Sequence, residues 1–177
     1  EVVGVVADTK YRTLTEPPQP HFYSPTEPKF HLALLVRAHG NPAALFEPVQ
    51  RALDAGARFV GKTITDELAY LMNGQNAHFG SPINGAAPDR IAGGSSSGSA
   101  SAVSNRMCDF ALGTDTGGSV RAPASHCGLV WLRPSHARVS LQGALDLAPS
   151  FDTCGWFARD AGVFERVGRV LLRDAAP

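Results

Sequence analysis

Cysteine is scarce in this sequence, and its few copies lack the spacing of a disulfide framework or a metal site. The chain has 177 residues and three cysteines, Cys108, Cys127 and Cys154, with no Cys-x-x-Cys pair. An odd, scattered set argues against a disulfide scaffold and against a structural zinc site. We therefore expect Cys127 and Cys154 to be small core residues, and we expect a reducing compartment, hence a cytoplasmic location.

Excess charge and long apolar runs are also missing. The 16 basic and 16 acidic residues cancel, so the formal net charge is zero. This balance gives no support for a nucleic acid or an anionic membrane as partner. No apolar run approaches the ~20 residues that a membrane helix needs, and no charged-then-apolar stretch of the secretory type opens the chain. We expect a soluble globular domain that does not bind a membrane.

Glycine and proline are plentiful, with 18 and 13 copies, and they separate short apolar segments. Period-two and β-branched patterns predict strands, and stripes at helical spacing predict helices. Strands are expected at residues 1–7, 31–38, 58–60, 109–113, 128–132 and 138–141. Helices are expected from Pro42 or Pro48 to about residue 55, and at residues 66–71, 100–107 and 161–171, the last capped by Asp160. This alternation predicts an α/β domain.

Two Gly/Ser loops frame one predicted helix and strand. Residues 93–99 read Gly-Gly-Ser-Ser-Ser-Gly-Ser, and residues 113–121 read Gly-Thr-Asp-Thr-Gly-Gly-Ser-Val-Arg. Glycine lets backbone N–H groups approach a ligand closely, and hydroxyls among them can act as nucleophiles. Taken alone, the first loop is more typical of a linker or a phosphate loop. It also fits the Gly-x-Ser-x-Gly nucleophile elbow centred on Ser96, which we reject because a loop rather than a strand precedes it.

From about Pro48 onward the sequence closely resembles the amidase signature family, the hydrolases with a Ser–Ser–Lys triad. The resemblance rests on residues 54–63 (Asp-Ala-Gly-Ala-Arg-Phe-Val-Gly-Lys-Thr) and on both Gly/Ser loops, which occur in the family's order. Residues 150–160 (Ser-Phe-Asp-Thr-Cys-Gly-Trp-Phe-Ala-Arg-Asp) also match, and their end is similar to the indole-acetamide hydrolase branch. The resemblance implies a mixed β-sheet flanked by helices. The family continues well beyond this stretch, so we expect an incomplete core truncated at its C-terminal side.

The first residues do not look like an amidase. Residues 1–8, 11–18 and 35–38 resemble the extracytoplasmic segment of MacB/FtsX-type permeases. We therefore divide the chain into an N-terminal strand and loop segment, residues 1–47, and an amidase core, residues 48–177.

The resemblance assigns roles to individual residues. Ser119 is the expected nucleophile, and Ser95, after a cis peptide at Gly94, relays protons between Ser119 and Lys62, the expected base. A base must be a neutral amine, so we expect Lys62 to be buried against hydroxyls. The expected oxyanion hole consists of the backbone N–H groups of Thr116, Gly117, Gly118 and Ser119. The implied function is cleavage of a small-molecule carboxamide through a Ser119 acyl-enzyme, with no metal or organic cofactor and with the oligomeric state left open.

Other interpretations remain for some residues. His126 and His136 are candidate bases of a Ser–His pair, although the lysine interpretation leaves them no role. Trp131 and Ala137 replace expected glycines, so we expect Trp131 to push strands apart and Ala137 to need a positive φ. The alternative to an enzyme is a catalytically inactive remnant that acts, if at all, as a binding or structural module.

Overall fold

The computed structural model describes residues 32–33 and 47–172. These form five strands, four α-helices and one short 3-10 helix, Glu67–Ala69. The strands are β1 (Leu32–Ala33), β2 (Phe59–Gly61), β3 (Phe110–Asp115), β4 (Val130–Leu132) and β5 (Thr153–Ala158). The α-helices are α1 (Glu47–Asp54), α2 (Ser97–Ser104), α3 (Arg121–His126) and α4 (Ala161–Leu172).

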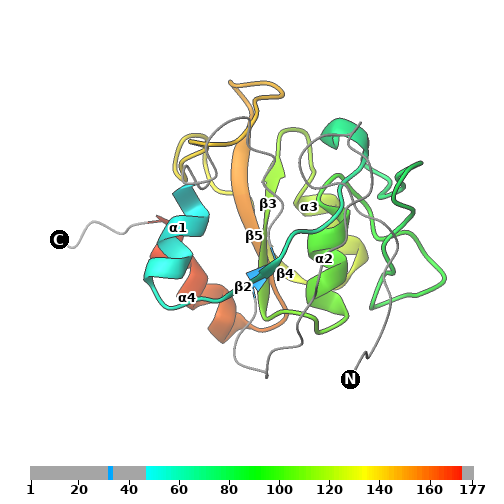
Figure 1. Ribbon diagram of the computed structural model, residues 1–177, viewed down its shortest axis with the longest axis horizontal. Coiled ribbons are helices and arrows are strands. Elements are labelled where there is room, and N and C mark those ends of the chain that lie inside the picture. The colour runs from blue at the N-terminus through cyan, green and yellow to red at the C-terminus, as the bar shows by residue number, and fades with distance from the viewer. Residues whose placement is uncertain (1–31, 34–46, 173–177) are drawn as a thin grey trace, which may run out of the picture.

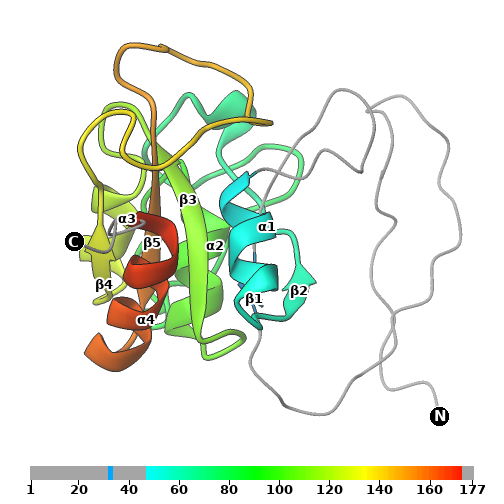
Figure 2. The same cartoon turned by 90° about the vertical axis from the view of Figure 1, so that its left-hand side faces the viewer.

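The strands form a single mixed sheet in the order β2-β1-β3-β5-β4. β1 runs parallel to β2 and β3, whereas β5 is antiparallel to β3 and β4. Helices α1 and α4 cover one face of the sheet, and α2 and α3 cover the other (Figure 1; Figure 2). The expected α/β class, a mixed sheet flanked by helices, is confirmed.

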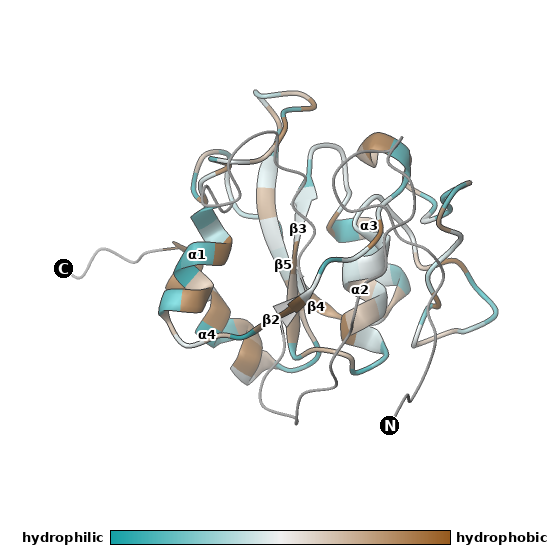
Figure 3. Ribbon diagram, viewed as in Figure 1, coloured by the Kyte–Doolittle hydropathy of each residue, from teal (hydrophilic) through white to brown (hydrophobic). Residues whose placement is uncertain are grey.

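Each face of the sheet has its own apolar core. Between the sheet and α2/α3, small side chains such as Ala100 and Ala111 pack around Phe157. Between the sheet and α1/α4, larger side chains gather around Trp156, including Leu112 and Leu171. Apolar and polar ribbon segments alternate along α1 and α4, as expected for helices with one buried face (Figure 3). Strand β5, buried along its whole length, separates the two cores.

Several element boundaries follow the local sequence. Helix α1 has Pro48 in its first turn, where a missing N–H group is harmless, and Gly56 follows it with φ +94°. Helix α4 is capped as predicted, because the Val163 N–H donates to Asp160 Oδ1 at 2.8 Å. Of the strand expected at residues 31–38, β1 lies in the described part. The strand expected at residues 1–7 lies outside the described residues.

Other expectations are wrong. Residues 66–71 do not form an α-helix, because Leu68 and Ala69 have φ values of +52° and +58°, and only the 3-10 helix forms. Residues 138–141 are not a strand. Two elements, α3 and β5, were not predicted. Strand β5 is buried on both faces and lacks the period-two alternation that marks a half-exposed strand.

The two glycine replacements have different outcomes. Ala137 has φ +60°, as expected for a glycine position. Trp131 does not separate the strands, since it pairs with Phe157 in the β4–β5 ladder and its side chain reaches solvent, with 37% exposure. Within the described part of the chain, no helix is long and apolar enough to cross a membrane.

Candidate active site

The two Gly/Ser loops meet at the C-terminal end of β3. The Ser96 N–H donates to the Ser119 carbonyl oxygen at 3.1 Å, so the backbones of the two loops are joined directly beside both predicted catalytic serines. Ser95 is 1% exposed and Ser119 is 8% exposed. The structure therefore brings together two loops that lie far apart in the sequence, and a shared catalytic role of Ser95 and Ser119 stays a prediction.

The first loop is seated on β3 by close backbone approach. The Ser96 hydroxyl donates to the Thr114 carbonyl oxygen at 3.2 Å, and a Cβ on Gly113 would lie 2.7 Å from the Ser96 hydroxyl. Only glycine therefore fits at position 113 without moving Ser96. The Gly94–Ser95 peptide bond is cis, as expected from the family resemblance. Helix α2 begins two residues later, at Ser97, with its N-terminus next to the loop.

The segment after Lys62 packs against the start of α2. The hydroxyls of Thr63 and Ser99 lie 3.0 Å apart, and the Gly98 N–H donates to the Ile64 carbonyl oxygen at 3.0 Å. Lys62 itself follows β2 and is exposed. The expected burial of Lys62 is therefore wrong for this structure. The motif places its neighbours beside the serine loop, whereas the side chain of Lys62 lies at the surface.

Asp115 anchors the loop that carries Ser119. Its fully buried carboxylate accepts the Val120 and Arg121 N–H groups at 2.9 and 3.2 Å, and both Nε and Nη2 of the Arg121 guanidinium at 3.1 and 2.9 Å. Burial by itself raises the pKa of Asp115, but these hydrogen bonds outweigh it and the pKa lies below its ordinary value. Asp115 and Arg121 thus brace the loop.

Asp152 is a further buried anchor, whose role the sequence did not reveal. It accepts one hydrogen bond from the Thr116 hydroxyl and two from the Leu147 and Ala148 N–H groups at 2.9 Å. Burial raises its pKa, but the bonds from Thr116 and the backbone prevail and lower it. The sequence separation between Asp152 and Thr116 hides this contact from any local pattern.

The expected oxyanion-hole residues form the turn between β3 and α3. Gly118 has φ +145°, and a Cβ there would lie 2.6 Å from the Met72 Cε atom. Its carbonyl oxygen accepts the Ala122 N–H at 2.8 Å, which ties the turn to α3. Gly117 has open space around its Cβ position, with no atom within 4 Å. An oxyanion role for this turn remains a prediction.

The competing residues have other surroundings. His136 Nε2 lies 2.7 Å from the Pro149 carbonyl oxygen, and His126 is exposed, with its ring close to Gly93. The three cysteines are buried and form no disulfide, and burial raises the pKa of Cys154 to about 12, so its thiolate is not available as a nucleophile. No cluster of metal-binding side chains occurs among residues 32–33 and 47–172.

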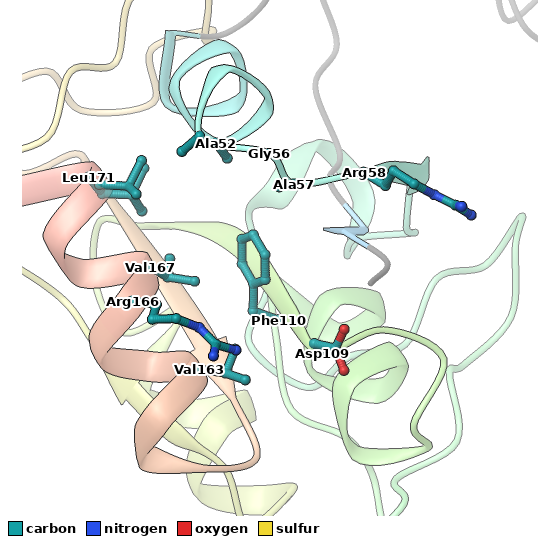
Figure 4. Close-up of a pocket in the computed structure, with 12 residues that line it drawn as sticks. Ala52, Gly56, Ala57, Arg58, Asp109, Phe110, Val163, Arg166, Val167 and Leu171 are labelled. Carbon is teal, nitrogen blue, oxygen red and sulfur yellow. The ribbon is translucent and has the colours of Figure 1, made fainter. Parts of the chain in front are cut away.

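One cavity lies away from the serine loops. It has a volume of about 270 Å³ and is bounded by α1, α4 and the start of β3, with Phe110, Val167 and Leu171 in its wall (Figure 4). None of the predicted catalytic residues lines it. The cavity and the serine loops are therefore separate features of the molecule.

Comparison with known proteins identifies the family. The amidase family model matches residues 42–176, which is most of the chain. Amidase 1 of Arabidopsis thaliana is 55% identical over 139 residues, which cover 78% of this chain and 33% of the relative. A translocon component of pea, Translocon at the outer membrane of chloroplasts 64, is 47% identical over 137 residues, covering 77% of this chain and 23% of that protein.

A solved structure gives the same result. A crystal structure of an amidase superposes with a TM-score of 0.74 and 36% identity, over 84% of this chain and 37% of that one. The chain therefore belongs to the amidase family. It spans about a third of the length of the first relatives that it matches.

Proposed function

We propose that this chain carries the serine centre of an amidase and cleaves the C–N bond of a small carboxamide. The carrying observation is the hydrogen bond from the Ser96 N–H to the Ser119 carbonyl oxygen, which holds the two serine loops together at the end of β3. Membership of the amidase family supports the reaction class.

In the proposed reaction the Ser119 hydroxyl oxygen attacks the amide carbon and forms a tetrahedral oxyanion. The Ser119 proton passes through the Ser95 hydroxyl to the leaving nitrogen, and the C–N bond breaks to give an acyl-enzyme and ammonia or an amine. Water then hydrolyses the Ser119 ester. Backbone N–H groups of residues 116–119 are the proposed oxyanion donors. Asp115 supports this geometry by fixing the N–H groups of the two residues after Ser119.

The general base of the relay needs separate evidence. The family resemblance assigns this role to Lys62, whose side chain is exposed in the structure. We retain Lys62 as the proposed base on the family motif and make it the part of the proposal that is tested separately.

The test is ammonia release from simple carboxamides by the chain and four single variants. Ser119→Ala and Ser95→Ala are expected to lose at least about 100-fold of the rate, because nucleophile and relay act on the reacting atoms. Ser125→Ala, which removes an exposed hydroxyl from α3, is the matched control and keeps the rate. An unchanged rate in Lys62→Met removes Lys62 from the relay, and an unchanged rate in Ser119→Ala contradicts the whole proposal.

A second candidate function is that of a binding or structural module without turnover. The exposure of Lys62 favours it, since the described residues do not supply the covered base that the relay needs. The pea relative named for a translocon shows that the family also includes proteins named for a membrane assembly. If this second candidate is right, the wild-type chain and all of its variants release ammonia only at the background rate.

A further inference from the structure

Asp66 is a buried carboxyl group for which the proposed reaction has no use. It lies just before the 3-10 helix and is 0% exposed. The Gly74 N–H donates to its Oδ2 atom at 3.3 Å, while its Oδ1 atom has no hydrogen-bond partner among the described residues. Burying a polar oxygen without a hydrogen-bond partner costs free energy, so a carboxyl group at this position calls for a structural reason.

The surroundings of Asp66 point to the loop that carries Ser95. The Asp66 N–H donates to the Ser95 carbonyl oxygen at 3.2 Å, so the main chain of Asp66 holds Ser95 directly. The Asp66 carboxyl group packs against Gly94, the residue before Ser95. A Cβ on Gly94 would lie 2.2 Å from Oδ2 and 2.8 Å from Cγ. Gly94 in turn donates its N–H to the Met72 carbonyl oxygen at 2.9 Å. Asp66 therefore contacts the Gly94–Ser95 unit from both its backbone and its side chain.

Charge is poorly compensated at this position. Among the described residues, the groups that shift the pKa of Asp66 include no lysine or arginine. The charged group that acts on Asp66 is Glu67, whose negative charge opposes ionisation of Asp66; the His126 ring lies beside Gly93, the residue before Gly94. Burial is the main cause that raises the pKa of Asp66, and the Gly74 and Asn73 N–H groups lower it only in part.

We infer that Asp66 is a positioning residue for Ser95, and that its carboxyl group acts through shape and hydrogen bonding rather than through charge. The positioning role rests on the proposed function, because Ser95 is the proposed proton relay. Its structural part, the clamp between the carboxyl group and Gly94, stands on the contacts alone. A residue that acts by shape is replaceable by its neutral isostere, whereas a residue that acts by charge is not.

The first experiment compares Asp66→Asn with Asp66→Ala. Labelling of Ser119 by a fluorophosphonate is expected to slow about 100-fold in Asp66→Ala, the loss typical of a misplaced catalytic group, and to return to within about threefold of wild type in Asp66→Asn. Asp89→Ala, which removes an exposed carboxyl group, is the control. Equal losses in both Asp66 variants, or no loss in Asp66→Ala, overturn the inference.

The second experiment is urea unfolding as a function of pH, and it does not depend on activity. Because the pKa of Asp66 is raised in the folded state, folding takes up a proton, and wild type gains stability relative to Asp66→Asn as the pH falls from about 7 toward about 4. An opposite trend shows that the charged form is the one the fold needs and overturns the inference. If wild type fails to label at all, the proposed function fails while this trend still decides the role of the carboxyl group.

A double-mutant cycle tests the clamp itself. Gly94→Ala forces a methyl group onto the Asp66 carboxyl group, so its destabilisation is expected to be smaller when Asp66 is already alanine. Part of the loss remains, because the same methyl group would lie 2.9 Å from the Gly74 nitrogen. Strict additivity of the two substitutions means that Asp66 and Gly94 do not contact each other in the way described, and this outcome contradicts the inference.

Discussion

The loop that presents Ser119 owes its shape to one carboxylate. Asp115 ends β3, and its two oxygens take up the N–H groups of Val120 and Arg121 together with the Arg121 guanidinium. Those N–H groups would otherwise be left without partners at the start of α3. A single residue thus links the sheet, the nucleophile loop and the following helix.

Asp115→Asn is expected to destabilise the chain by about 1.5–3 kcal/mol, the range for a hydrogen bond to a charged group. The value lies at the lower end because the Arg121 side chain is 43% exposed and water screens the pair. Urea unfolding at neutral pH measures it, with Asp89→Asn as the exposed control.

The same comparison has a defined pH dependence. The pKa of Asp115 is lowered in the folded state, so its contribution is present above the ordinary carboxyl range and is lost as the pH falls through that lowered pKa. The difference between wild type and Asp115→Asn should therefore shrink below about pH 4. A difference that is independent of pH would show that charge does not matter at this position.

At the scale of elements, the helices differ in how far the sequence determines them. α4 has a local cap, a stripe of apolar residues and a polar outer face, and its start at Ala161 follows from these features.

Asp160→Ala is expected to cost about 1 kcal/mol of stability, since it removes the acceptor of the Val163 N–H. Asp160→Ser keeps an acceptor and should recover most of the lost stability when both variants are compared by thermal unfolding. Equal losses in the two variants would show that the cap contributes nothing.

Elements set by long-range contacts escaped prediction. The run Asp66–Leu71 has helical composition, yet Leu68 and Ala69 adopt positive φ values while Asp66 is drawn to Ser95 and Gly74. Strand β5 pairs with β3 and β4 on either side, so both its faces are covered and its sequence shows no alternation. Local sequence cannot show what lies across the sheet.

The candidate site likewise has parts that the sequence predicted and parts that it did not. The sequence singled out the two Gly/Ser loops, whose backbones meet in the structure, and the family resemblance implied the cis peptide before Ser95. The buried anchors Asp66 and Asp152 were missed because each acts on a residue well removed in sequence. The burial of Lys62 was predicted wrongly because the motif defines its strand end but not what covers it.

For the molecule as a whole, the sheet with its two cores is expected to unfold as one unit. Trp156 is fully buried in the α1/α4 core, whereas α2 belongs to the other face, and β3 and β5 are shared by both. Tryptophan fluorescence and far-UV circular dichroism should therefore give coincident urea transitions. Two separated midpoints would show that the faces fold independently, as expected for an incompletely folded remnant.

The most direct measurement of the central claim is the site of covalent modification by a fluorophosphonate probe, mapped by peptide mass spectrometry. The account predicts one adduct, on Ser119, which is absent in Ser119→Ala and much reduced in Ser95→Ala, because the joined loops place both serines at the end of β3. Continued labelling of the Ser119→Ala chain, or an adduct on another serine in wild type, would contradict it.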